Sequence, residues 1–166
     1  MGREIERKFL VKFDTYKDSS IGILYKQGYL CSEAERVVRV RLIGHKAYIT
    51  IKGKNVGAAR DEYEYEIPYK DAEEIIEKLC EKPIIEKIRY IEEHGGFTWE
   101  IDEFHGENEG LIVAEIELNS ENENFKKPDW VGEEVTDDSR YYNSNLGRNP
   151  YKNWWWLKGV SNNEVA

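Results

Sequence analysis

Apolar and polar residues alternate with a period of two along much of the chain. In Glu4–Phe13, for example, Ile5 and Phe9 fall on one side and Glu6 on the other. Such alternation is typical of a β-strand whose two faces have different surroundings. The pattern recurs in seven more segments that we predict to be strands: Leu24–Cys31, Val37–Leu42, Ala47–Lys52, Asp61–Ile67, Ile84–Ile91, Phe97–Phe104 and Leu111–Asn119. Most of the connections are short turns, so the sheet is predicted to be antiparallel.

Helical periodicity occurs only between or after these strands. Asp71–Cys80 has an apolar face and a suitable N-cap in Asp71. Ser120–Lys127 is a short polar candidate that Pro128 would end. A third helix is predicted over Asp137–Leu146, closed by a glycine at its C-terminal end. These patterns favour a mainly β fold (α+β) in which a few helices pack outside the sheet.

The end of the chain has a different character. Residues 148–166 show no regular pattern and contain the aromatic cluster Trp154, Trp155 and Trp156. We therefore expect one strand-rich domain over residues 1–147, followed by an irregular, aromatic-rich tail to which we assign only a packing role.

The polar faces of the strands carry like charges in pairs, at positions i and i+2. The pairs are Glu4/Glu6, Arg39/Arg41, Glu62/Glu64, Lys87/Arg89, Glu100/Asp102 and Glu115/Glu117. Two such side chains point the same way, about 7 Å apart, and repel each other. A face that only meets water would be more stable with the two signs mixed. The pairs therefore indicate a surface that binds a ligand.

The residue types indicate which ligand. Clustered carboxylates without histidine or cysteine suit Mg²⁺ or Mn²⁺, which prefer oxygen ligands. Clustered arginine and lysine suit phosphate oxygens. An eight-stranded closed barrel has room inside for one small ligand, so we favour such a barrel, with its charged faces inward, over a sheet with one face in water.

Composition and charge narrow the classes of function. A chain of 166 residues suits one domain, and a net charge of -9 argues against binding to a nucleic-acid backbone. The N-terminus is charged at once and no apolar run has the length of a membrane span, so we expect no signal peptide, no membrane partner and a cytoplasmic protein. The sequence leaves open whether the chain is a monomer or a homodimer.

The run Glu4-Ile5-Glu6-Arg7-Lys8-Phe9-Leu10 contains Glu-x-Glu-x-Lys and resembles the opening motif of the CYTH superfamily, the triphosphate tunnel metalloenzymes. Other pieces follow in the family's order: Arg39-Val40-Arg41, Thr50-Ile51-Lys52, Arg60-Asp61-Glu62-Tyr63-Glu64, Glu86-Lys87-Ile88-Arg89-Tyr90, Glu100-Ile101-Asp102, Glu115-Ile116-Glu117, Gly132-Glu133-Glu134-Val135-Thr136 and Arg140-Tyr141. The resemblance implies an eight-stranded antiparallel tunnel that binds a triphosphate through basic residues and divalent cations through carboxylates. It is greatest to the small bacterial tripolyphosphatases, which implies hydrolysis of inorganic triphosphate to pyrophosphate and phosphate.

The resemblance also distributes the roles. The side chains assigned to the phosphates are Lys8, Arg39, Arg41, Lys52, Lys87 and Arg89. Two Mg²⁺ or Mn²⁺ ions are expected, the first on Glu4 and Glu6 with one or both of Glu115 and Glu117, the second near Glu62, Glu64 or Asp102. The residues expected to act directly in catalysis are Glu4, Glu6, Lys8, Tyr29, Lys52, Glu62 and Glu64.

Several alternatives remain open at this point. Glu100 could pair with Lys87 or Arg89 instead of binding a ligand, and Tyr29 could serve packing alone. Within the same superfamily, the activity could be that of an adenylate cyclase or of a thiamine or nucleoside triphosphatase. Outside it, the rival is a module that binds polyphosphate without catalysis, although such a module would not need paired carboxylates.

Overall fold

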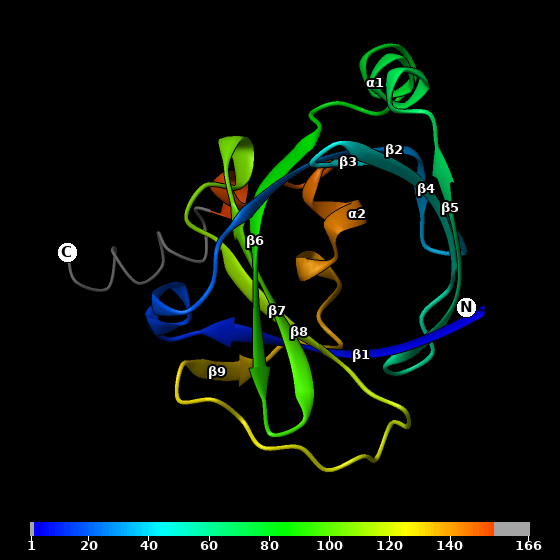
Figure 1. Ribbon diagram of the computed structural model, residues 1–166. Coiled ribbons are helices and arrows are strands. Elements are labelled where there is room, and N and C mark those ends of the chain that lie inside the picture. The colour runs from blue at the N-terminus through cyan, green and yellow to red at the C-terminus, as the bar shows by residue number, and fades with distance from the viewer. Residues whose placement is uncertain (1, 155–166) are drawn as a thin grey trace, which may run out of the picture.

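The structure is a computed structural model that describes residues 2–154, and its central feature is a ring of antiparallel strands (Figure 1). Within these residues there are nine strands: β1 Gly2–Val11, β2 Ile23–Glu33, β3 Arg36–Ile43, β4 Lys46–Gly53, β5 Ala59–Ile67, β6 Ile85–His94, β7 Phe97–Phe104, β8 Ile112–Glu117 and β9 Val131–Glu134. Their order in the sheet is β5-β4-β3-β2-β6-β7-β8-β1-β9, and β5 also pairs with β1. That last pairing closes an eight-stranded barrel, so the predicted fold class is confirmed.

Strand β1 makes the closure because its two halves have different neighbours. Its first half pairs with β5, with Glu4 opposite Arg60, and its second half pairs with β8, with Lys8 opposite Glu115. Near its end it also pairs with the short strand β9, where Phe9 lies opposite Glu134. The alternation of β1 did not reveal this third neighbour, and four residues are too few for β9 to show a pattern of its own.

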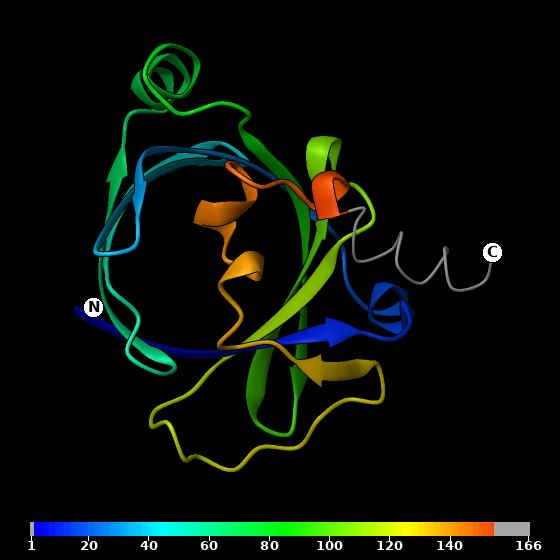
Figure 2. The ribbon, with the colours of Figure 1, turned by 180° about the vertical axis from the view of Figure 1, so that it is seen from behind.

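A helix of 10 residues covers part of the barrel from outside. Helix α1, Tyr69–Lys78, lies against the outer surface beside β3 and β4 (Figures 1 and 2). Its buried residues Ala72 and Ile76 pack with Val40 and Ala47 of the wall. The predicted N-cap Asp71 is wrong, because the helix begins earlier: the carbonyl of Pro68 accepts the first helical hydrogen bond, from the amide of Ala72.

The helix predicted over Ser120–Lys127 is wrong. This segment has turns and irregular backbone, and it lacks an apolar face that could hold a helix against the barrel. Phe125 is anchored by edge contacts to Phe9 and Trp99 on the outer surface, and Glu121 accepts a hydrogen bond from the amide of Ala58.

The helix predicted over Asp137–Leu146 is present only in pieces. A 3-10 turn, η3 (Ser139–Tyr141), is followed by the four-residue helix α2 (Asn143–Leu146), and the two are separated by Tyr142 in extended conformation. The closing glycine, Gly147, keeps right-handed helical angles and makes no left-handed cap. Both views show α2 within the outline of the barrel, unlike α1 (Figure 2).

Most of the apolar core lies on the outer face of the barrel, and a second cluster, which includes the cavity-lining residues Tyr29 and Val37, lies on the inner side with Leu146 of α2. The largest cluster includes Phe9, Trp99, Ile101 and Trp130, all almost completely buried. Trp154 of the predicted tail packs at right angles to Tyr141, whereas Trp155 and Trp156 lie outside the described residues. Across residues 2–154, every helix is too short or too polar to span a lipid bilayer.

Candidate active site: a charged tunnel

The inward faces of the strands enclose a cavity of about 200 Å³. The predicted site residues that line it are Glu4, Glu6, Lys8, Tyr29, Arg39, Arg41, Lys52, Glu62, Glu64, Lys87, Arg89, Glu115 and Glu117. They come from seven of the eight strands of the ring, so the period-two pattern placed them correctly on one face. Asp102 is buried just behind this lining.

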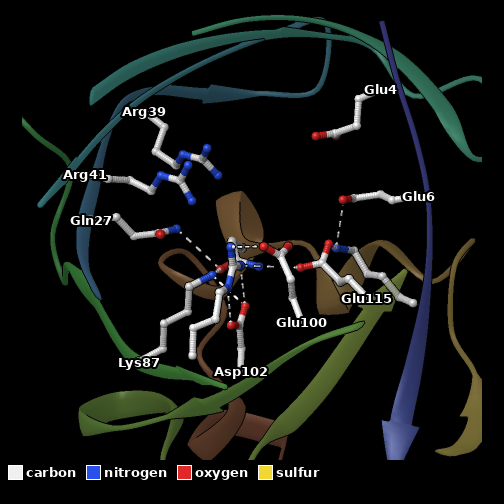
Figure 3. A network of polar contacts seen from close by, with 12 residues as sticks. Glu4, Glu6, Gln27, Arg39, Arg41, Lys87, Glu100, Asp102 and Glu115 are labelled. Atoms are coloured by element: carbon white, nitrogen blue, oxygen red, sulfur yellow. Dashed lines mark hydrogen bonds and ion pairs between the residues drawn. The ribbon is translucent and has the colours of Figure 1, made fainter. Parts of the chain in front are cut away.

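Arginine side chains and several carboxylates lie on opposite sides of the cavity, although Glu64 lies with the arginines and Lys8 and Lys52 lie with the carboxylates. Figure 3 shows Arg39 and Arg41 on one side, and Glu4, Glu6 and Glu115 on the opposite side. A polyanion with bound cations has the complementary arrangement, because its phosphate oxygens meet the basic side while the cations meet the carboxylates.

Arg39 and Arg41 project from β3 with few partners of their own. An Nη of Arg41 donates to Glu64 at 2.8 Å, and an Nη of Arg39 donates to the hydroxyl of Thr50 at 3.2 Å. The Nε atoms of both arginines are buried and unbonded within the described part of the chain. Burial, with repulsion from Arg39 and Arg89, lowers the pKa of Arg41. Positive charge is therefore in excess here, which favours binding of an anion.

The second basic pair, Lys87 and Arg89 on β6, is held by one buried carboxylate. Arg89 binds Asp102 through two hydrogen bonds, of 2.7 and 2.9 Å, and Lys87 donates to Asp102 at 2.8 Å. Burial opposes ionisation of Asp102, but Arg89 and Lys87 outweigh it and lower its pKa to about 2. Burial lowers the pKa of Lys87 to about 7, against the pull of Asp102. Arg89 also contacts Glu100 at 3.2 Å, so this pairing is present.

An aromatic ring that the sequence did not single out lies beneath this basic side. The guanidinium carbon of Arg89 is 4.7 Å from the ring centroid of Tyr25, and that of Arg41 is 5.5 Å away. The electron-rich face of the ring stabilises both cations. Tyr25 lies two residues before Gln27 and four before Tyr29, so the alternation of β2 was the available signal.

On the acidic side, Glu4 and Glu62 share one lysine. Lys52 lies 3.2 Å from Glu4 and 3.3 Å from Glu62. Burial raises the pKa of Glu4 even though Lys52 lowers it, and the carboxylates Glu62 and Glu115 add to the increase. One ammonium therefore does not compensate the local negative charge.

The same is true of Glu6, which shares Lys8 with Glu115. Lys8 lies 2.6 Å from Glu115 and 3.4 Å from Glu6. Burial and the neighbouring Glu115 raise the pKa of Glu6 well above its usual range. Glu117, opposite Glu6 in the sheet, has a pKa raised by burial and by Glu4.

These carboxylates have the chemistry of a site for a hard cation. Within residues 2–154, no three of them converge on one point, because the lysine ammonium groups lie between them. They nevertheless line one wall of one cavity, and the raised pKa values of Glu4, Glu6 and Glu117 reveal uncompensated negative charge. A divalent cation with oxygen ligands fits this donor set.

Sequence reasoning missed the neutral polar residues of the tunnel. Gln27 and Thr50 are fully buried on β2 and β4, and Asn143 lines the cavity from α2. Thr50 donates to Glu64 at 2.7 Å while accepting from Arg39. Glutamine, threonine and asparagine are common at protein surfaces, so only the inward alternation of β2 and β4 could have signalled two of these residues. Nothing in the sequence signalled Asn143.

Known proteins are similar to this one over most of its chain. The chain is 60% identical over 154 residues to an inorganic triphosphatase of Acetivibrio thermocellus, covering 93% of this chain and 99% of that protein. It is 36% identical to an inorganic triphosphatase of Nitrosomonas europaea, covering 86% and 95%. A crystal structure of an inorganic triphosphatase superposes with a TM-score of 0.62 at 34% identity, covering 87% of this chain and 93% of the other. Residues 2–145 match the CYTH domain, and this chain belongs to the CYTH family.

Proposed function

We propose that this protein hydrolyses inorganic triphosphate to pyrophosphate and phosphate, with the help of divalent cations, inside its tunnel. The observation that carries the proposal is a single cavity in which Arg39 and Arg41 lie on one side and the carboxylates of Glu4, Glu6 and Glu115 on the other. The relatives named inorganic triphosphatases support the same activity.

The basic residues provide binding and orientation. Arg39, Arg41 and Arg89 can place forked N–H donors around phosphate oxygens, and Lys87 adds a point charge. Because these side chains come from two different strands, they can hold a chain of phosphates at several points and keep the terminal phosphorus in one position.

The carboxylates provide the metal site. Glu4, Glu6, Glu115 and Glu117 would hold Mg²⁺ or Mn²⁺, with Glu62 and Glu64 close to a second position. A bound divalent ion would neutralise phosphate charge and lower the pKa of a coordinated water. Lys8 and Lys52, which now lie between carboxylates, would be free to turn towards phosphate oxygens once a cation takes their place.

We assign Asp102 a different role from the metal ligand that the sequence predicted. Both of its oxygens accept hydrogen bonds from Lys87 and Arg89, and its pKa of about 2 reflects this saturation. A carboxylate with such partners serves best as a positioning residue for the two basic side chains.

Phosphate release from tripolyphosphate, ATP and thiamine triphosphate, measured side by side with Mg²⁺ or Mn²⁺, tests the proposal. We expect tripolyphosphate to be the preferred substrate and EDTA to abolish its hydrolysis. Cyclic AMP formed from ATP would instead identify a cyclase. Tight binding of tripolyphosphate without any product would identify a non-catalytic binding module. Full turnover in metal-free buffer would contradict the role given to the carboxylates.

A further inference from the structure

Gln27 on β2 is fully buried and faces into the barrel, where its amide holds two other groups. Its Nε2 donates to the hydroxyl of Tyr29 at 3.1 Å and to Oδ1 of Asn143 at 3.3 Å. Figure 3 shows the side chain reaching from its strand towards the middle of the network. Within the described residues its Oε1 is buried and has no hydrogen-bond partner.

The direction of each amide in this group follows from Lys87. Its Nζ donates at 2.8 Å to Oδ1 of Asn143, and in the ammonium form, which can only donate, the atom of Asn143 that faces it must be the oxygen. The atom of Gln27 that faces the same oxygen must then be the nitrogen. A flip of the Gln27 amide would therefore not give its Oε1 a partner without breaking the bond to Asn143.

This arrangement lowers stability, because a buried acceptor without a partner loses its hydration and gains no hydrogen bond. Its effect is to aim two donors. The oxygen of Asn143 is taken by Lys87 and Gln27, so its NH₂ group is turned away from both. The hydroxyl of Tyr29 accepts from Gln27, so its own hydrogen is left for another acceptor. Tyr29 and Asn143 both line the cavity.

We propose that Gln27 is a positioning residue that aims the Tyr29 hydroxyl and the Asn143 amide at a phosphoryl oxygen of the bound substrate. The proposal rests on the triphosphatase function proposed above. Neutral donors suit this place because the cations Arg41, Lys87 and Arg89 already stand close together. Neutral N–H and O–H donors bind phosphate oxygens without adding a further charge that these cations would repel.

The first test replaces Gln27 by methionine, which has a similar shape and no hydrogen-bonding amide. We expect kcat/KM for tripolyphosphate to fall about tenfold, the usual loss for one or two misdirected hydrogen bonds to a charged group. The melting temperature should not fall, because the variant also removes the unpartnered Oε1. The matched control is Ser32→Ala, a buried polar residue of the same strand that bonds Glu81 and does not line the cavity. The control should keep full activity.

The second test asks whether Gln27 acts through the two donors. In a protein that already carries Tyr29→Phe and Asn143→Ala, the change Gln27→Met should cost less than about twofold, because the groups it aims are gone. If it still costs its full tenfold there, or if Gln27→Met alone keeps wild-type kinetics, the proposal is overturned.

A second variant, Gln27→Glu, keeps the shape of the side chain and loses the N–H donor, so it should lose activity similarly. The melting temperature of Gln27→Glu gives a second, independent measurement of how much the Gln27 side chain contributes to folding. If both variants fail to fold, Gln27 is structural and the proposal is overturned.

The outcomes also separate this inference from the proposed function. If the wild-type protein neither binds nor hydrolyses tripolyphosphate in the presence of Mg²⁺ or Mn²⁺, the proposed function fails and the inference falls with it. If the wild type is active and the Gln27 variants match it, only the inference fails.

Discussion

Single residues in the tunnel carry charges that their partners compensate incompletely, and Glu6 is the clearest case. Its raised pKa, caused by burial and by Glu115, means that the folded state binds this proton more readily than the unfolded state does. Its contribution to the free energy of unfolding is therefore present at acid pH. It is lost as the pH rises above the ordinary value of 4.5 and through the folded pKa.

Glu6→Gln removes this titration. We expect the variant to melt about 2–4 °C above the wild type at pH 7, equivalent to about 1 kcal/mol, with the difference shrinking towards pH 4. Hydrolysis of tripolyphosphate should be largely lost, because the variant removes one of the carboxylates that we propose as ligands of the cation. Thermal melts over this pH range check the first part and phosphate release the second. A variant that melts lower than the wild type at pH 7 would show that the contact with Lys8 outweighs the repulsion.

Arg41 offers the corresponding test on the basic side. Arg41→Ala should lower kcat/KM for tripolyphosphate about 100-fold, because it removes a forked donor that we propose to bind phosphate oxygens. The melting temperature should change little, because relief of the repulsion from Arg39 and Arg89 offsets the lost bond to Glu64. Arg36→Ala is the control, since Arg36 belongs to the same strand but is exposed and pairs with Glu33. A melting temperature lowered by more than about 10 °C would make Arg41 a structural residue.

For single residues, the sequence predicted which side chains line the cavity better than it predicted which of them contact one another. Like charges at i and i+2 must share a face, so thirteen of the fourteen residues predicted for the site line the cavity. Which charge meets which depends on the pairing of strands far apart in sequence. Asp102 was for that reason predicted as a metal ligand, although it lies opposite Arg89 and bonds to it.

Among the elements, β2 has the weakest alternation and the strictest packing. Gly28 lies close to the residues that follow helix α1, where an added Cβ would be 2.7 Å from the Cβ of Cys80 and 2.9 Å from its Sγ. Both distances are shorter than real contacts allow, so the strand and the end of the helix would have to move apart. A glycine is required here by the close approach of these two segments.

Gly28→Ala should therefore destabilise the fold by about 1–3 kcal/mol, which corresponds to roughly 2–12 °C in melting temperature. Gly53→Ala is the control, because a Cβ at the end of β4 would meet only ordinary contacts, the nearest at 3.6 Å from Asp61. Differential scanning calorimetry of the two variants measures the difference between their melting temperatures. Equal melting temperatures would mean that α1 adjusts at no cost.

The elements that the sequence predicted poorly share a physical cause. Strands with an inner and an outer face have a strong period, and all eight were located. Short elements have none: β9 has four residues, and α2 has four held by neighbours, not by an apolar stripe of its own. In Ser120–Lys127, after β8, no helix forms, and Phe125 packs on the outer aromatic cluster.

The whole molecule concentrates like charges inside a closed wall, so its stability should depend on what occupies the tunnel. Tripolyphosphate with Mg²⁺ should bind only the folded barrel. At 100 times its dissociation constant it would add about 2.7 kcal/mol, or roughly 5–10 °C in melting temperature. The measurement uses Glu6→Gln protein so that the ligand is not consumed. Orthophosphate, which cannot span both basic pairs, should give a clearly smaller shift. No shift with tripolyphosphate, in mutant and wild type alike, would contradict binding of this substrate class.

The position of β1 at the seam of the barrel has a consequence for biosynthesis. Of the described strands, β1 with Glu4, Glu6 and Lys8 is made first and its partner β8 is made next to last, and Lys8 and Glu115 are 107 positions apart. The ring cannot close until β8, Ile112–Glu117, has emerged, so closure depends on contacts of long sequence separation and should be slow. Until then both edges of the sheet stay open to pairing with other chains. A nascent chain arrested before residue 112 would therefore have no complete site, however many of its strands had already paired.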